Sequence, residues 1–257
     1  MAILNFQKPD KIILQKASDF NAQFEFRPLE PGYGVTIGNA LRRVLLNSLE
    51  GYAIVGIKIE GVDHEFATLK GVSEDVVELL LNLKQVRFKK IGDQDFTSEK
   101  ISISIKNKTE FTAALIGENT QAFQIMNPEL LICTLDSSAR LDLELTIGKG
   151  RGYVPAEDNK PKESPVGYIP TDSIFTPIKN VKYSIENTRV EQRTDFEKLI
   201  MEVSTDGTIH PEEAVKQASR ILIQHLMIIT DENITFDNKE EKKEDLVDEQ
   251  TLQLRKV

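Results

Sequence analysis

The stretch LEPGYGVTIGNALRRVLLNSL, residues 29–49, decides the fold, and it is typical of a turn followed by an amphipathic helix. Pro31, Gly32 and Gly34 favour the turn. Thr36 is the expected N-cap, because its hydroxyl can accept a hydrogen bond from a free N–H of the first helical turn. Apolar residues then recur with the spacing of a single buried helix face. This face is predicted to contain Ile37, Ala40, Leu41, Val44, Leu45, Ser48 and Leu49.

The opposite face of this helix carries Asn39, Arg42, Arg43 and Leu46, again at helical spacing. A purely solvated face has no need of a leucine among its polar groups. The two arginines admit two interpretations. They are either ordinary solvated charges, as most arginines on helix surfaces are, or part of a protein docking site, for which the planar guanidinium is well suited.

Composition predicts a globular cytoplasmic protein. A chain of 257 residues with 40% hydrophobic content can form a packed core, and it has no apolar run long enough for a membrane span. The N-terminus lacks the basic start and apolar core of a signal peptide. The single cysteine, Cys133, cannot form an intrachain disulfide, which suits a reducing compartment.

The charge distribution argues against a body that binds nucleic acid by itself. The formal net charge is −9, and the segment 231–257, with nine acidic and five basic residues, contributes −4 of it. The remaining body therefore carries about −5, whereas a nucleic-acid-binding domain usually has a basic balance or a basic stripe. Residues 236–257 are mixed in charge, and we expect them to form a flexible linker.

Periodicity predicts amphipathic helices near both ends of the chain and a β-rich middle. The second of these helices spans residues 211–229, and a more buried helix spans 73–84 with Ser73 as its N-cap. The runs ISISI and LDLEL alternate and indicate a sheet with one solvated face. The expected strands are 11–18, 21–28, 53–59, 86–90, 100–106, 110–115, 130–135, 140–148, 181–190 and 196–204, and 149–176 is expected to be a long loop.

The predicted fold class is α+β. The simplest assembly is a dimerising two-helix and antiparallel-sheet domain from residues 1–50 and 179–235, with a second, mostly β domain inserted as residues 51–178. The first domain has more apolar helix surface than it can bury alone, and homodimer formation is the usual solution. A Leu45→Glu or Ile221→Glu change is expected to place an unpaired charge in that seam.

No residue pattern predicts catalysis, a metal site or a cofactor. The glycine-rich run GKGRGYVP, residues 148–155, lacks the Gly-Lys-Ser/Thr helix start of a phosphate-binding loop, so a turn leaving a strand is favoured. His64, His210 and His225 do not have zinc-site spacing, and Cys133 lies in an apolar, strand-like run. We expect no catalytic residues in this chain.

Several long motifs occur in a fixed order: GYGVTIGNALRRVLLNSL, GVDHEFATLKGVSEDVVELLLNLK, GKGRGYVPAE and NVKYSIENTRVEQRTDFEKLIMEVSTDGTIHPEEAVKQAS. Together they resemble the bacterial RNA polymerase alpha subunit family, over about residues 5–235. The resemblance implies a non-catalytic subunit of a nucleotidyltransferase that dimerises and seats the beta and beta-prime subunits. It implies contact with DNA only through the whole complex, or through a small C-terminal domain that the sequence to Val257 does not include, and a cytoplasmic, nucleoid-associated location without membrane contact.

The resemblance also implies three contact surfaces. The homodimer would use Ile37, Leu41, Val44, Leu45, Ser48, Ala218, Ile221, Leu222, His225 and Leu226. The beta subunit would contact Glu30, Gly32, Tyr33, Asn39, Arg42, Arg43 and Leu46. The beta-prime subunit, or another surface of the large subunits, would contact Lys84, Arg151, Tyr153, Gly167 and Thr171.

Two other functions stay open from the residues alone. One is a homodimeric enzyme, whose site would need convergent titratable groups in a pocket. The other is a stand-alone nucleic-acid-binding module that uses Lys149, Arg151 and the basic run RFKK at residues 87–90. A salt-dependent affinity of the isolated chain for DNA would reveal the second.

Overall fold

The structure is a computed structural model, and it describes residue 9 and residues 11–92, 97–137, 139–163, 165–190 and 193–230. The chain divides into two compact units, Met1–Ile221 and Leu222–Val257. Helix α4 (Pro211–Thr230) supplies the described residues of the second unit. The predicted linker, residues 236–257, lies outside the described part of the chain.

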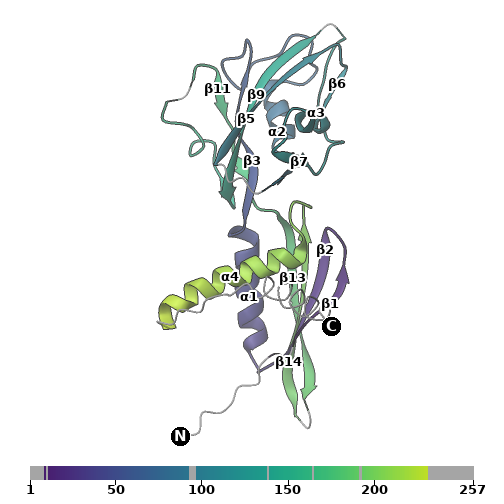
Figure 1. The fold of residues 1–257 in the computed structure, drawn as a ribbon, viewed down its shortest axis with the longest axis vertical. Helices are drawn as coiled ribbons and strands as arrows, with labels where there is room; N and C mark the ends of the chain where they lie inside the picture. Colours follow the sequence, from purple (N-terminus) through teal and green to yellow (C-terminus); the bar gives the residue numbers. More distant parts are fainter. Residues whose placement is uncertain are drawn as a thin grey trace, which may run out of the picture. The chain divides into compact units, whose positions relative to one another are not determined.

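A four-stranded antiparallel sheet joins the two ends of the first unit (Figure 1). Its order is β1-β2-β14-β13, so the first two strands of the chain pair with the last two. Phe24 lies opposite Met201 in this sheet, and both side chains are buried. The strands span Lys11–Ala17 (β1), Asn21–Leu29 (β2), Ile178–Val190 (β13) and Arg193–Thr205 (β14), which confirms four predicted strands and lengthens the last two.

Helix α1 (Tyr33–Asn47) packs against β13 and β14 through its smallest residues. A methyl group built on Gly38 would come within 2.9 Å of the Tyr183 ring, so the helix approaches the sheet more closely than a larger side chain permits. The predicted stripe is therefore partly wrong, because its centre is displaced toward the glycines. The buried residues are Gly34, Gly38, Leu41 and Leu45, whereas Ile37, Ala40, Val44 and Ser48 are only half-buried.

The start of α1 also differs from the prediction. The N-cap is Gly32, whose φ of 88° lies in the left-handed region that glycine adopts without a Cβ penalty. Thr36 is not the N-cap, because it lies inside the helix, and its hydroxyl donates to the Gly32 carbonyl at 3.2 Å. The N–H groups in the first turn of α1 must therefore donate to an acceptor elsewhere in the chain.

A six-stranded antiparallel sheet forms the second part of the first unit (Figure 1). Its order is β5-β9-β3-β4-β7, and β11 adds to β3. These strands are β3 (Glu50–Ile59), β4 (Phe88–Lys90), β5 (Ser98–Lys106), β7 (Phe123–Ile125), β9 (Arg140–Arg151) and β11 (Tyr168–Pro170). Two small pairs accompany them, β6 (Glu110–Thr112) with β8 (Leu131–Thr134) and β10 (Tyr153–Val154) with β12 (Ser173–Ile174).

The core of this second part is built from β3, β5 and β9 together with helices α2 (Val76–Leu83) and α3 (Ala113–Glu118). Ile57, Leu79 and Leu145 are fully buried in it. The sheets and the fold class agree with the predicted α+β arrangement.

Four local features of this part differ from the prediction. Asp75, not Ser73, caps α2, because its carboxylate accepts from the Glu78 N–H at 2.7 Å. The expected strand 110–115 ends at Thr112, and the alanine-rich segment after it becomes α3. Residues 123–125 form strand β7, which was not predicted, and the expected loop 149–176 contains β10, β11 and β12.

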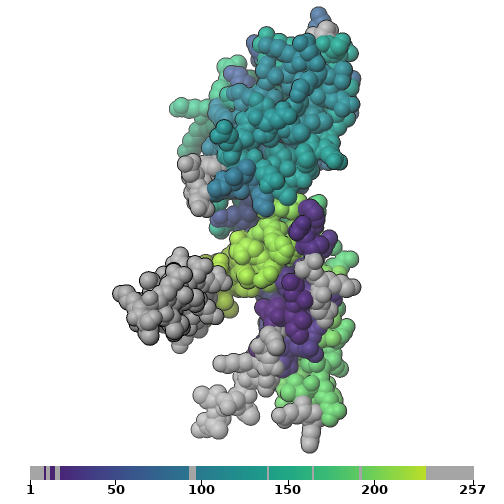
Figure 2. Space-filling view, turned by 45° about the vertical axis from the view of Figure 1, so that its right-hand side comes forward, coloured from purple at the N-terminus to yellow at the C-terminus, as the bar shows by residue number. Residues whose placement is uncertain are grey.

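Helix α4 begins at the predicted Pro211. Proline is tolerated there because the N–H of the first helical residue has no intrahelical acceptor, so its absence costs no hydrogen bond. Ala214, Val215 and Ala218 are buried within the first unit. In the second unit the helix leaves Ile228 and Ile229 78% and 77% exposed, and α4 appears yellow-green at the surface in Figure 2. Within the described residues, no helix is long and apolar enough to cross a membrane.

Candidate functional site

The polar face of α1 is exposed, but its two arginines differ. The Arg42 Nε donates to the Val181 carbonyl of β13 at 3.1 Å, so this side chain is held against its own chain. Arg43 is exposed and makes no hydrogen bond or ion pair with any of the residues described. Asn39 is exposed beside them, and Leu46 is half-buried. The face therefore offers one anchored and one unengaged guanidinium group.

The turn before α1 is fixed by a carboxylate from the other end of the chain. The two oxygens of Glu197 on β14 accept hydrogen bonds from the Gly32 and Gly34 N–H groups, both at 2.8 Å. Neither N–H group has an acceptor within the helix, because both lie at its N-terminus. The negative carboxylate also interacts favourably with the positive end of the helix dipole. A methyl group on Gly34 would lie 2.7 Å from a Glu197 oxygen, so the fit requires glycine.

The sequence did not point to Glu197 as a contact of this turn, and placed it only in the predicted strand 196–204. The glycines at the helix start signal that an acceptor must come from elsewhere. The sequence gives no means of finding that acceptor more than 160 residues away. Beside this turn, Tyr33 is 45% exposed and Glu30 is half-buried. The candidate beta-contact turn is therefore held rigid by its own chain.

The residues expected at a dimer seam fall into two groups. Leu41, Leu45 and Ala218 are at most 4% exposed, so in this structure they are core residues of their own chain and are not available for direct contact. A Leu45→Glu change would therefore disrupt the protomer itself and cannot report on a seam. The other expected residues keep some exposure: Ile37, Val44, Ser48 and Ile221 in the first unit, and Leu222, His225 and Leu226 in the second.

Three of the five expected beta-prime residues, Lys84, Tyr153 and Thr171, gather around Asp172, whereas Arg151 pairs with Glu50. Lys84 Nζ lies 2.6 Å from one Asp172 carboxylate oxygen, and the Tyr153 hydroxyl donates to the other at 3.3 Å. Burial alone would raise the pKa of Asp172, but the hydrogen bond and charge of Lys84 outweigh it and hold that pKa below its ordinary value. Thr171 is 4% exposed, so its side chain is a buried neighbour of this cluster rather than part of its surface.

The segment that carries these residues is anchored to β3. The Asn159 amide donates to the Thr171 carbonyl at 2.8 Å and to the Ser173 hydroxyl at 3.0 Å. The Ser173 hydroxyl in turn donates to the Ile54 carbonyl at 2.6 Å. Beyond this anchor, Gly167 lies next to β11 with a φ of 79°, and Val166 before it is 86% exposed. Such a pinned segment can present a fixed surface to a partner.

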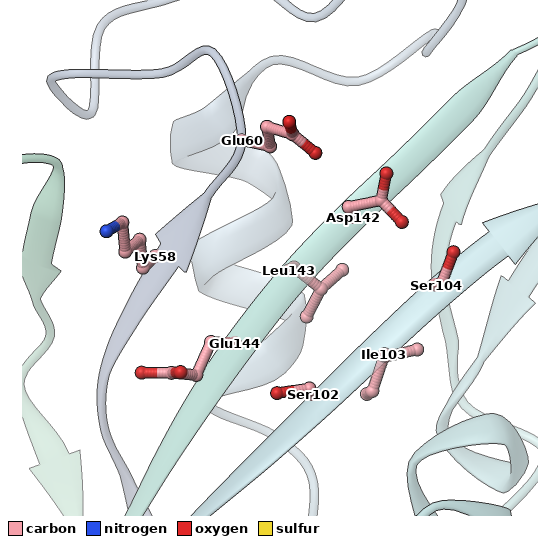
Figure 3. Close-up of a pocket in the computed structure, with 8 residues that line it drawn as sticks. All are labelled: Lys58, Glu60, Ser102, Ile103, Ser104, Asp142, Leu143 and Glu144. Carbon is pink, nitrogen blue, oxygen red and sulfur yellow. The ribbon is translucent and has the colours of Figure 1, made fainter.

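A groove of about 380 Å³ crosses the solvent face of β3, β5 and β9 (Figure 3). A hydrogen bond with Ser104 is the main reason that the pKa of Asp142 lies below its usual range. Glu144 accepts from Lys100 Nζ at 2.8 Å. The described residues that line the groove include no histidine or cysteine, and they match the predicted solvated face of ISISI and LDLEL.

Residues that could supply nucleophilic or metal chemistry are dispersed. Cys133 is fully buried, and that burial raises its pKa to about 12, so the thiol stays protonated. His64, His210 and His225 are exposed: His64 lies in a loop, His210 directly before α4 and His225 on α4. Within the described ranges, no group of three or more His, Cys, Asp or Glu residues is arranged to hold a metal ion.

Comparison with known proteins agrees with the motif order. Residues 57–176 match the family described as the RNA polymerase Rpb3/RpoA insert domain. Three curated proteins named DNA-directed RNA polymerase subunit alpha are similar over all 257 residues, which span 78% of each relative's length. They come from Cytophaga hutchinsonii at 62% identity, Flavobacterium psychrophilum at 55% and Bacteroides thetaiotaomicron at 54%.

Proposed function

This chain belongs to the family of bacterial DNA-directed RNA polymerase alpha subunits, and we propose that it forms a homodimer on which the beta and beta-prime subunits assemble. The observation that carries the proposal is the division of α1 into distinct faces. One face packs on its own sheet, a half-buried apolar flank adjoins it, and an exposed polar face carries Arg42 and Arg43.

The dimer would form through the apolar flank of α1 and the open part of α4. Support comes from the half-buried Ile37 and Val44 and from Leu226, which is 57% exposed. Isolated exposed apolar residues are ordinary, but a run of them along one helix marks an interaction surface. The insert-domain match supports the division into residues 51–178 and a dimerising domain of residues 1–50 and 179–235.

The beta subunit would dock on the Glu30–Gly34 turn and the polar face of α1. Support comes from the Glu197 carboxylate, which fixes the turn before any partner binds. A surface that is already rigid loses little conformational entropy on binding. Arg43 supplies an exposed guanidinium that can make several hydrogen bonds at once, together with Asn39 and the edge of Leu46.

The beta-prime subunit would contact the cluster around Asp172. Support comes from Tyr153, 59% exposed on β10, which pairs with β12 of the anchored segment, and from the exposed Arg151 two residues before it. Aromatic and arginine side chains are enriched at protein interfaces. In this proposal the chain supplies no catalytic residue or cofactor, and it reaches DNA only as part of the assembled polymerase.

The experiment is a paired measurement on Arg43→Ala. Sedimentation should show an unchanged dimer, because truncation of an exposed side chain changes stability by only about 0.5 kcal/mol or less. Capture of the beta subunit at matched concentration should weaken at least tenfold, as for a desolvated interface arginine. Arg140→Ala on β9, also an exposed arginine, is the control. An unchanged dimer with unchanged capture of the beta subunit would show that Arg43 is an ordinary solvated charge.

A further inference from the structure

The first unit contains a six-stranded part, β3 to β12 with α2 and α3, and a four-stranded part, β1, β2, β13 and β14 with α1. The chain enters the first of these parts between α1 and β3 and leaves it between β12 and β13, and the two connections cross. A methyl group built on Gly51 would overlap the Phe175 carbonyl oxygen, so the crossing is closer than any side chain permits. Two crossing connections are a narrow joint, and they do not by themselves fix an orientation.

Side chains do not fill the junction between the two parts. A cavity of about 320 Å³ is lined by residues that include Tyr52 and Phe88 of the six-stranded part, Ile209 before α4, and Gln217 on α4. Two parts of a chain keep one orientation without further help only where their interface is large and apolar. The orientation therefore depends on specific contacts elsewhere in the junction.

Arg87 contacts both sides of the junction through one guanidinium group. Its backbone is held in the six-stranded part, because its N–H donates to the Asn127 side-chain oxygen at 2.9 Å and its carbonyl accepts from the Met126 N–H at 3.0 Å. Its Nη1 donates to the carbonyl of Ile174, the last residue of β12, at 3.2 Å. Its Nε lies 3.8 Å from a carboxylate oxygen of Asp206, which directly follows β14 of the four-stranded part.

The Asp206 carboxylate is a fixed and poorly solvated partner. Its other oxygen accepts from the Thr208 N–H at 2.9 Å and from the Thr208 hydroxyl at 2.6 Å. The Asp206 N–H donates to the Pro177 carbonyl at 2.9 Å. The Asp206 side chain is 5% exposed and that of Arg87 is 23% exposed, so salt screens their attraction less than it screens a surface pair.

We propose that Arg87 is a positioning residue, which fixes the orientation of the six-stranded part on the four-stranded part by bridging Ile174 and Asp206. The proposal rests on the assembly role given above. The candidate beta surface on α1 belongs to one part and the cluster around Asp172 belongs to the other, so Arg87 sets the geometry between them. A scaffold that holds two binding surfaces at a fixed span raises the effective concentration of the second partner.

The orientation can be measured in the full chain with spin labels on Ser102→Cys in β5 and Ser184→Cys in β13, both exposed positions. Cys133 does not compete for the label, because it is buried and its thiol stays protonated. Excess unlabelled chain ensures that a homodimer carries one labelled copy. Double electron–electron resonance should give one narrow distance distribution, which Arg87→Gln should broaden or displace. Arg193→Gln, an exposed arginine of β14, is the control and should leave it unchanged.

Asp206→Asn separates the ion pair from the turn after β14. The amide keeps an oxygen that can accept from Thr208, but it removes the charge that faces Arg87. This variant should change the distance distribution as Arg87→Gln does, and the double variant should add nothing to either, because both remove the same interaction. A general loss of stability lowers the melting temperature without moving two folded parts, so the distribution separates positioning from stability.

Capture of the large subunits tests the consequence for assembly. Arg87→Gln should leave beta capture within about twofold, and it should weaken the addition of beta-prime to the alpha–beta complex roughly fivefold or more. An unchanged distance distribution would overturn the proposal. A changed distribution with unchanged beta-prime addition would overturn its link to assembly. If the unchanged chain captured neither subunit, the proposed function and this link would both fail, whereas the distance distribution would still decide whether Arg87 positions the two parts.

Discussion

The two sheets of the first unit differ in how their apolar faces are covered. The six-stranded sheet is covered by its own helices α2 and α3, and its core contains fully buried residues such as Ile57 and Leu145. The four-stranded sheet receives α1 on β13 and β14, and it leaves Ile12 of β1 56% exposed and Val35 of α1 53% exposed. In the proposed dimer, the second arrangement would gain part of its cover from the partner.

The largest effect on stability is expected in the core of the six-stranded sheet, whose apolar face is covered by α2 and α3. Leu145→Ala should lower the free energy of unfolding by about 2–5 kcal/mol, because the side chain is fully buried and leaves a cavity in the six-stranded core. Urea denaturation measures it. Leu81→Ala on α2 is the matched control, since Leu81 is 51% exposed and should change the value by about 0.5 kcal/mol or less. Equal losses for both variants would refute a self-contained core.

The next largest effect should come from the open part of α4. Leu226→Asp should weaken dimer formation by at least about 2 kcal/mol, more than tenfold in dissociation constant, because it places a charge at an apolar contact. Sedimentation over a concentration series measures it, and the exposed Gln224→Asp is the control on the same helix. A Leu226→Asp chain that dimerises as tightly as the unchanged one would contradict the proposed dimer interface.

A smaller effect is expected from the carboxylate that fixes α1. Glu197→Gln should lower the free energy of unfolding by about 1–2 kcal/mol, because an amide offers one oxygen where the carboxylate offers two to Gly32 and Gly34. Hydrogen exchange of these two amides should also become faster. Glu186→Gln on β13, which breaks only an exposed ion pair with Lys198, is the control. Unchanged exchange in Glu197→Gln would show that the turn is held by other contacts.

The smallest effect on stability is expected at Glu50, the first residue of β3. Its folded pKa lies below its ordinary value of 4.5, so its ion pairs stabilise the fold above that pH and the contribution disappears as pH falls through the folded pKa. The group is 44% exposed, so the contribution is at most about 1 kcal/mol. Unfolding of the unchanged chain and of Glu50→Gln between neutral and acid pH measures it. A difference that grows toward acid pH would contradict this sign.

The sequence by itself determined the fold class, most of the strands and the long helices. It could do so because alternation and helical periodicity are local, and because Pro211 and the glycines of the α1 turn restrict only their neighbours. The order of the long motifs also identified the family, which the similarity to curated alpha subunits confirms. Short segments were less certain: residues 113–118 became a helix that replaces the end of the predicted strand 110–115, because tertiary packing outweighs weak local preference.

Only the tertiary structure decided which residues meet. The stripe of α1 was predicted from hydrophobicity, but its contact line runs through Gly34 and Gly38, because the closest approach of a helix to a sheet depends on the absence of side chains. Glu197 reached the start of α1, and Lys149 reached Glu50, through strand pairings between distant parts of the chain. Periodicity fixes which face a residue occupies, whereas its partner depends on register and on how the helices lie on the sheets.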